Sequence, residues 1–178
     1  YVKEQDDTFY RMDSTYHRCV NDPMALDIYG ISHSSSLMNN HALDFLTAMG
    51  YTSRGFESKY FGGTIVGDSL IGLKYAIVEW EDNGVEVKPK NRLRVFEDLY
   101  TDIYNNGYVL HVYENPYALP IAFWADEQLS STKLEIDVEN NVFENQNKLL
   151  NNILGTEGLE FFKEVGRKNR NTKKMIHG

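Results

Sequence analysis

The sequence predicts an α+β fold: a single domain with a mixed or antiparallel sheet and a few helices packed against it. Two segments have the apolar spacing of helices, and several others alternate apolar with polar residues as strands do. An Asn-Asn-Gly sequence at 105–107 separates two of the strand-like segments, where it favours a tight hairpin. With 178 residues, of which 42% are hydrophobic, the chain is long enough to bury a core.

The first part of the chain is expected to contain two short strands before its first helix. Thr8–Met12 has strand composition, and Tyr29–Ser36 is expected to be a strand followed by a loop. After the helix, Tyr51–Gly63 is rich in Gly, Ser and Tyr, so we expect a loop that includes one strand at most.

That first helix is predicted from both its spacing and its ends. Four apolar residues follow i, i+3, i+4 and i+7 spacing: Ala42, Phe45, Leu46 and Met49. Asn39 or Asn40 can cap the N-terminus, and Gly50 stands where a helix commonly ends.

The middle of the chain is expected to form a helix and two strands. Thr64–Leu73 is predicted as a short helix that runs into a strand over Lys74–Trp80, where β-branched and aromatic residues are frequent. Asp82-Asn83-Gly84 is a turn sequence, and Val85 and Val87 then alternate with charged residues as in a half-exposed return strand.

The second half is predicted to contain a hairpin, two further strands and two helices. In chain order these are strands at Tyr100–Tyr104 and Tyr108–Glu114, strands at Ile121–Ala125 and around Leu134, Ile136 and Val138, and helices at Asn141–Leu154 and Thr156–Val165.

The stretch Tyr113–Trp124, YENPYALPIAFW, places two prolines between strand-like segments. Asn115 precedes Pro116, which favours extended backbone, and neither Pro116 nor Pro120 can donate a ladder hydrogen bond. We therefore expect a strand, a rigid corner and a second strand.

The same stretch also has the residue types of a carbohydrate-binding surface, in which rings stack on sugars and amides bond their hydroxyls. The candidate substrate-binding residues are Tyr113, Asn115, Tyr117 and Trp124. A packing role is the alternative, and it is favoured for Tyr113 and Trp124 because large aromatic residues in strands are usually buried.

Charge and cysteine content exclude several classes. A net charge of −8 disfavours nucleic acid and anionic membrane surfaces as partners of the whole domain. The single cysteine, Cys19, allows neither an internal disulfide nor a zinc site built on Cys pairs. No apolar run approaches the roughly 18 residues of a membrane span. We expect one domain over residues 1–166 and a basic, flexible tail over 167–178.

No catalytic or metal-binding pattern stands out. His33 lies in a serine-rich stretch at 32–36 and offers the residue types of a small hydrolase, but a GxSxG elbow is absent and a polar loop is the simpler interpretation. The five histidines lack HxH and HxxxH spacing, and the 26 acidic residues define no preferred pair. We therefore predict no catalytic residue, no metal and no cofactor in this chain.

Several stretches, taken in order, resemble one family. The most specific are Asp68–Tyr75 (DSLIGLKY) and Tyr113–Pro120 (YENPYALP), and the supporting ones are Phe9–Arg11, Gly30–Ser32, Leu43–Leu46, Met49–Tyr51 and Phe143–Leu150. Together they resemble the extracytoplasmic region of YfhO-type bacterial membrane proteins, over nearly the whole chain.

The resemblance implies a parent protein with many membrane spans and a GT-C-type glycosyltransferase architecture, in the cell membrane of a Gram-positive bacterium. It implies transfer of sugars from a polyprenyl-phosphate carrier to wall polymers, notably teichoic or lipoteichoic acid. The family's catalytic acidic residue lies near the first spans, outside these residues. This segment would then be extracellular, with the membrane-embedded remainder of the chain, and a wall polymer or lipid-linked sugar, as partners.

Three hypotheses follow. The first is a non-catalytic accessory domain of such a membrane protein. The second is a free-standing carbohydrate-binding or adhesion module of the cell surface, and the third is a small hydrolase that uses His33.

Overall fold

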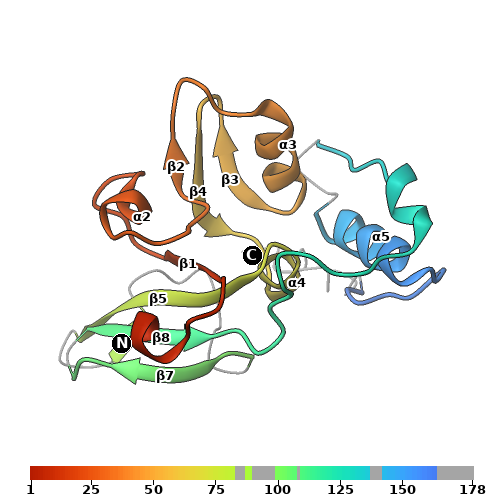
Figure 1. Cartoon of the computed structure of the whole chain (residues 1–178). Coiled ribbons are helices and arrows are strands. Elements are labelled where there is room, and N and C mark those ends of the chain that lie inside the picture. The colour runs from red at the N-terminus through yellow and green to blue at the C-terminus, as the bar shows by residue number, and fades with distance from the viewer. Residues whose placement is uncertain (83–86, 90–98, 108, 137–141, 164–178) are drawn as a thin grey trace, which may run out of the picture.

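Two sheets, with helices around them, make up the part of the chain that the computed structural model describes: residues 1–82, 87–89, 99–107, 109–136 and 142–163 (Figure 1). The larger sheet has the order β1-β5-β8-β7, with β6 paired to β5, and the smaller sheet has the order β2-β4-β3. The α+β prediction is therefore confirmed.

The strands are β1 (Arg11–Ser14), β2 (His33–Ser34), β3 (Tyr51–Arg54), β4 (Glu57–Gly62), β5 (Leu73–Asp82), β6 (Val87–Pro89), β7 (Thr101–Asn105) and β8 (Leu110–Glu114). The helices are α1 (Val2–Gln5), α2 (Asp22–Ala25), α3 (Asn40–Ala48), α4 (Ile65–Leu70), the 3-10 helix η1 (Glu127–Ser131) and α5 (Val142–Leu154). The larger sheet is mixed, because β1 runs parallel to β5 while the other pairs are antiparallel.

Most of the locally encoded elements form as predicted. Asn39 caps α3, where its side chain accepts a hydrogen bond from the backbone N–H of His41 at 2.9 Å. The predicted hairpin is β7–β8, and α4, β5 and α5 lie where the sequence indicated them. The return strand predicted from Val85 is represented by β6, which runs back along β5. Residues 83–86, which include the end of the predicted turn and the start of that strand, lie outside the described residues, as does the proposed 167–178 tail.

Tyr51–Gly63 is a hairpin of two strands, β3 and β4, and not a loop. Gly50 and Gly62 close its open end with φ of +89° and +86°. A Cβ on Gly62 would lie 2.3 Å from the carbonyl oxygen of Gly50, so the approach requires glycine. Among the Gly, Ser and Tyr residues that suggested a loop, Tyr51, Ser58 and Tyr60 are buried in the two strands, which composition alone did not reveal.

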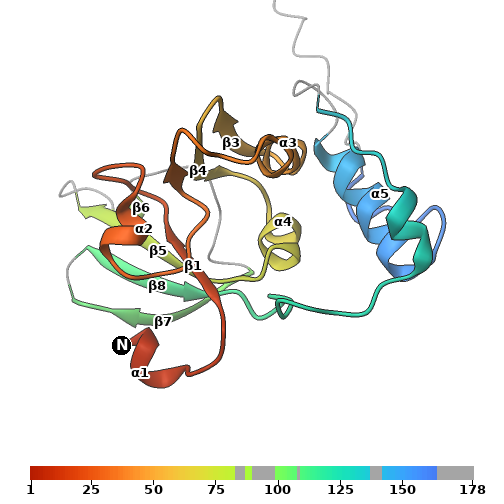
Figure 2. The same ribbon diagram turned by 45° about the horizontal axis from the view of Figure 1, so that its top comes forward.

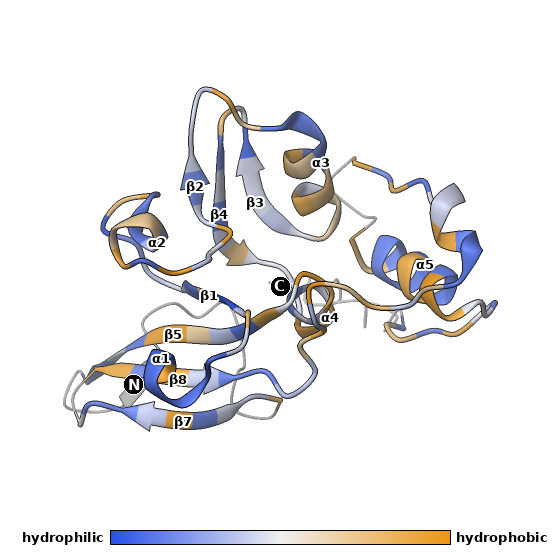
Figure 3. Cartoon of the chain, viewed as in Figure 1, coloured by the Kyte–Doolittle hydropathy of each residue, from blue (hydrophilic) through white to orange (hydrophobic). Residues whose placement is uncertain are grey.

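The larger sheet has a core on each face. Above it, Met49, Leu73, Ala76 and Val78 pack with four buried tyrosines and Leu149 of α5. Below it, α1 covers a smaller cluster of Val2, Met12, Tyr75 and Val112 (Figure 2). Hydrophobic residues lie along β5 and in α4, where the sheet meets the helices (Figure 3).

The helix α5 docks through buried amides as well as through Leu149. Asn145 donates to the carbonyl of Ala48, and Gln146 donates to that of Met49 at 3.0 Å. These carbonyls belong to the last turn of α3, where no intrahelical N–H is left to pair with them. The two side chains therefore cap α3 from a segment almost one hundred residues later.

Three predicted elements are wrong. Residues 121–125 form no strand, and neither do 134–136; Val138 lies outside the described residues. Residues 156–163 are not helical, because the side chains of Asn147 and Asn151 accept hydrogen bonds from the backbone N–H groups of Leu159, Phe161 and Phe162. Those N–H groups are thus taken by side chains instead of by helical carbonyls.

Candidate functional site

Asn115 fixes the proline-flanked corner after β8. It is 1% exposed, and its side-chain oxygen accepts from the N–H of Tyr117 at 3.0 Å. Its amide nitrogen donates to the carbonyl of Leu73 and to the hydroxyl of Ser69, both at 3.2 Å. All polar atoms of this side chain serve the corner, so the geometry favours packing over ligand binding at Asn115.

The other three residues of the predicted site divide between core and solvent. Tyr113 is buried in the core above the sheet, whereas Tyr117 is 62% and Trp124 is 97% exposed. The expectation that Trp124 is packed in a strand is therefore wrong, since the segment that carries it pairs with no strand. Of the four residues of the predicted site, only Tyr117 and Trp124 can offer a ring to a ligand from solvent.

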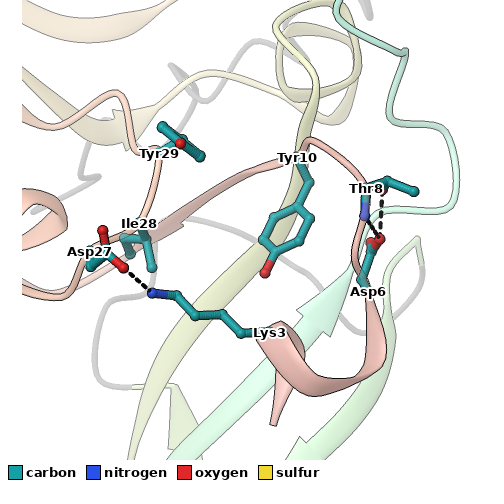
Figure 4. Close-up of a pocket in the computed structure, with 7 residues that line it drawn as sticks. All are labelled: Lys3, Asp6, Thr8, Tyr10, Asp27, Ile28 and Tyr29. Carbon is teal, nitrogen blue, oxygen red and sulfur yellow. Dashed lines mark hydrogen bonds and ion pairs between the residues drawn. The ribbon is translucent and has the colours of Figure 1, made fainter.

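A pocket that the sequence did not indicate lies between α1 and the segment after α2. It encloses about 230 Å³, and its lining residues are Lys3, Asp6, Thr8, Tyr10, Asp27, Ile28 and Tyr29 (Figure 4). The ring of Tyr10 stands in its middle, between Asp6 and Thr8 on one side and the Lys3–Asp27 ion pair on the other. A more apolar cavity of about 320 Å³ adjoins it and shares Lys3 and Ile28.

Asp6 is the most heavily bonded acid of this pocket. It accepts hydrogen bonds from Lys74 at 2.7 Å, from the Tyr75 hydroxyl at 2.8 Å and from Thr8. Burial opposes its charge, but these bonds outweigh burial and hold the pKa of Asp6 well below its ordinary value. Burial and the bond to Asp6 raise the pKa of Tyr75 to about 12. Asp6 is thus held in place by its hydrogen bonds and stays ionised at neutral pH.

The remaining groups of the pocket are suited to a neutral polar ligand. Lys3 pairs with Asp27 at 2.8 Å and Lys74 pairs with Asp6, so each carboxylate has a cationic partner. The Tyr10 hydroxyl has no hydrogen-bond partner among the described residues, and burial raises its pKa, which keeps it protonated. Tyr29 is 67% exposed and packs beside Phe9 with 5.1 Å between ring centroids, so its ring is steadied yet open to solvent.

The buried acids elsewhere serve the fold. Asp68 is fully buried and accepts hydrogen bonds from the hydroxyls of Tyr51 at 2.6 Å, Tyr60 at 2.9 Å and Tyr100. Asp68 thereby joins α4 to the β3–β4 hairpin and to Tyr100, the residue just before β7. Asp68 opens the DSLIGLKY motif, and its contacts give that motif a structural role.

Asp13 anchors the chain before β2. It is fully buried and accepts from the N–H groups of Ile31 and Ser32 at 2.7 and 2.8 Å. Burial raises the pKa of Asp13, and the hydrogen bonds from Ser32, Ser14 and Ile31 only partly offset it.

Ser32 is the one hydroxyl of the serine-rich stretch that meets both an acid and a histidine. Its Oγ is 3.1 Å from Asp13 and 3.3 Å from His17 Nε2, and it accepts from the N–H of Tyr60 at 2.8 Å. The residue is 2% exposed, so the hydroxyl is committed to internal bonds. His33 instead lies in β2 opposite Ser58. This arrangement favours structure over the nucleophile of the hydrolase hypothesis.

No group of three or more potential metal ligands is found among the described residues. The Cys19 thiol is exposed, and its hydrogen bond to Asp22 raises its pKa. His111 and Asp102 form a pair at 2.7 Å on the β7–β8 hairpin.

Comparison with protein families decides the wider assignment. The chain matches the family model "Bacterial membrane protein YfhO" over residues 1–177. The chain belongs to the YfhO family. No curated protein and no solved structure matches it. The family consists of bacterial membrane proteins. Within the described residues of this YfhO-family chain, no helix has the length and apolar character needed to cross a bilayer.

The sequence could not have indicated the pocket of this YfhO-family chain. Asp6 meets Lys74 and Tyr75 across 68 and 69 positions, and an acid followed by Thr8 is ordinary turn chemistry. The one signal present was that Lys74 and Tyr75 end the DSLIGLKY motif of the family resemblance.

Proposed function

We propose that this chain is an extracellular accessory domain of a GT-C-type membrane glycosyltransferase that acts on wall polymers such as teichoic or lipoteichoic acid in a Gram-positive bacterium. In this proposal the chain holds a sugar of the polymer, while transfer takes place near the membrane spans. Family membership supports the membrane context, and the pocket around Tyr10 carries the binding role.

The pocket suits one neutral sugar ring. Its volume is below the roughly 300–1,000 Å³ of sites for drug-sized ligands. Tyr29 offers a ring face for stacking, the Tyr10 hydroxyl is free to bond, and Asp27 and Thr8 add polar atoms at the rim. The paired charges favour an uncharged ligand, and the net charge of −8 disfavours the phosphates of such a polymer.

Titration of the ¹⁵N-labelled chain with neutral monosaccharides (glucose, galactose and N-acetylglucosamine) tests this role. We expect amide shifts confined to residues 3–10 and 27–29. Tyr29→Ala should weaken binding about fivefold through the lost ring, and Tyr10→Phe should weaken it through the lost hydroxyl. Tyr117→Ala, which removes an exposed ring outside the pocket, is the matched control. Shifts absent at millimolar sugar would refute the binding role.

The second candidate is a free-standing carbohydrate-binding or adhesion module that uses the exposed rings of Tyr117 and Trp124. The exposure of these two rings favours it. In the same titration it predicts shifts at Tyr117 and Trp124, with the pocket unchanged. A polypeptide that lacks hydrophobic spans on both sides of this segment would also favour it.

A further inference from the structure

The segment after the proline-flanked corner presents apolar side chains to solvent. Trp124 is 97%, Ile121 67% and Phe123 39% exposed. No charged residue occurs from Tyr117 through Ala125, in a chain where 25% of residues are charged. The segment thus combines an uncharged sequence with outward-facing large side chains.

Among the described residues, backbone hydrogen bonds hold this segment at its two ends only. The N–H of Leu119 donates to the carbonyl of Ser69, and the N–H of Asp126 donates to that of Ile153, both at 2.9 Å. Between them, residues 120–125 make no hydrogen bond to any other described residue. Figure 2 shows the chain running between the end of β8 and η1 without a neighbouring strand or helix along its middle.

We propose that residues 121–124 form a membrane-contact loop that lies at the headgroup level of a lipid bilayer, with Tyr117 beside it. The chain belongs to a family of membrane proteins, so a bilayer is part of its surroundings. Tryptophan and tyrosine are enriched at this level of membrane proteins, because their rings are apolar at one end and polar at the other.

The unpaired backbone groups of the loop determine how deeply it enters the bilayer, and its charge determines which lipids it prefers. Unpaired N–H and C=O groups are costly in the hydrocarbon interior, so the contact is shallow. The loop contains no cation, so its contact with a neutral bilayer is apolar and independent of salt. The charge of −8 on the chain repels an anionic surface, so anionic bilayers are bound more weakly than neutral ones, and salt reduces that difference. The inference depends on family membership and not on the sugar pocket, so the two proposals can fail separately.

The two tryptophans make the test direct. Trp80→Phe leaves Trp124 as the single tryptophan of the chain, and its emission is recorded with phosphatidylcholine vesicles at millimolar lipid. We expect a blue shift, quenching by lipids brominated near the headgroup end of their acyl chains, and no change between low and high salt. If Trp80→Phe does not fold, the difference between the spectra of the parent chain and Trp124→Phe isolates the same signal.

Two further variants complete the experiment. Trp124→Phe keeps only Trp80 and should show no lipid-dependent shift, and Ile121→Ser combined with Phe123→Ser should lower partition into vesicles at least about tenfold. Unchanged Trp124 emission at the highest lipid concentration would overturn the inference. It would also be overturned if the shift arose from neutral oligosaccharide without lipid, or from raised protein concentration alone, which would indicate a sugar or a second copy as the occupant.

Discussion

At the scale of single residues, Asp68 fixes the positions of three of the buried tyrosines in the core that includes Met49 and Leu73. Three tyrosine hydroxyls, from β3, from β4 and from Tyr100 just before β7, donate to one carboxyl group that has no exposure to water. Removing a buried acceptor leaves its donors without partners, which costs more than the bonds contribute in net terms.

Asp68→Asn should lower the free energy of unfolding by about 2–4 kcal/mol, because the amide presents N–H where hydroxyls donate. Urea denaturation measures the change. Asp7→Asn, an exposed acid of the same charge, is the control and should stay within about 0.5 kcal/mol of the parent. Equal effects of the two substitutions would contradict the structural role of Asp68.

Asp6 gives the fold a defined dependence on pH. Its pKa in the folded chain lies below the unfolded value of about 3.9, so its contribution to stability is fully present above that value and is lost as the pH falls towards the folded pKa. We expect the parent chain to be more stable than Asp6→Asn by about 1 kcal/mol at pH 7. The difference between their unfolding free energies should shrink from about pH 4 downwards. A difference that grew with acidity would have the wrong sign for this account.

At the scale of elements, amide side chains replace part of the apolar packing of α5. Phe143 and Leu154 of that helix are about half exposed, whereas Gln146 is fully buried between the carbonyl of Met49 and the hydroxyl of Thr64. The helix is therefore positioned by hydrogen bonds to the end of α3 and to the start of α4.

Gln146→Ala should destabilise the chain by about 2–3 kcal/mol, since two buried partners lose their bonds. Hydrogen exchange should show faster exchange in α5 before the sheet is affected. Glu144→Ala, on the exposed side of the same helix, should leave both quantities nearly unchanged. Exchange that accelerated equally in β5 and α5 would indicate that α5 is not a separately docked element.

The sequence predicted the elements whose signals are local. It did not predict elements whose structure depends on contacts with residues distant in the sequence. An Asn cap and a turn sequence were enough for α3 and for the β7–β8 hairpin. Residues 121–125 have strand composition, but they pair with no strand among the described residues, and composition alone cannot reveal whether a partner exists. Residues 156–163 are kept from forming a helix by hydrogen bonds to the side chains of Asn147 and Asn151. The pocket depends on a contact between Asp6 and Lys74 of β5, which lie 68 positions apart in the sequence.

At the scale of the whole molecule, the YfhO-family chain combines a stable mixed sheet with two surface features: the pocket around Tyr10 and the exposed loop at 121–124. The buried acids and the Ser32 hydroxyl are used inside the fold, and the pocket offers a free hydroxyl and an open ring. The central claim is that the chain binds a sugar without transforming it.

The most direct measurement is one NMR titration that follows both partners, with the labelled chain and a neutral saccharide in the same tube. The account predicts amide shifts at residues 3–10 and 27–29 while the spectrum of the saccharide keeps its own resonances over hours. New saccharide resonances that grow with time, or an amide spectrum unmoved at millimolar saccharide, would contradict it.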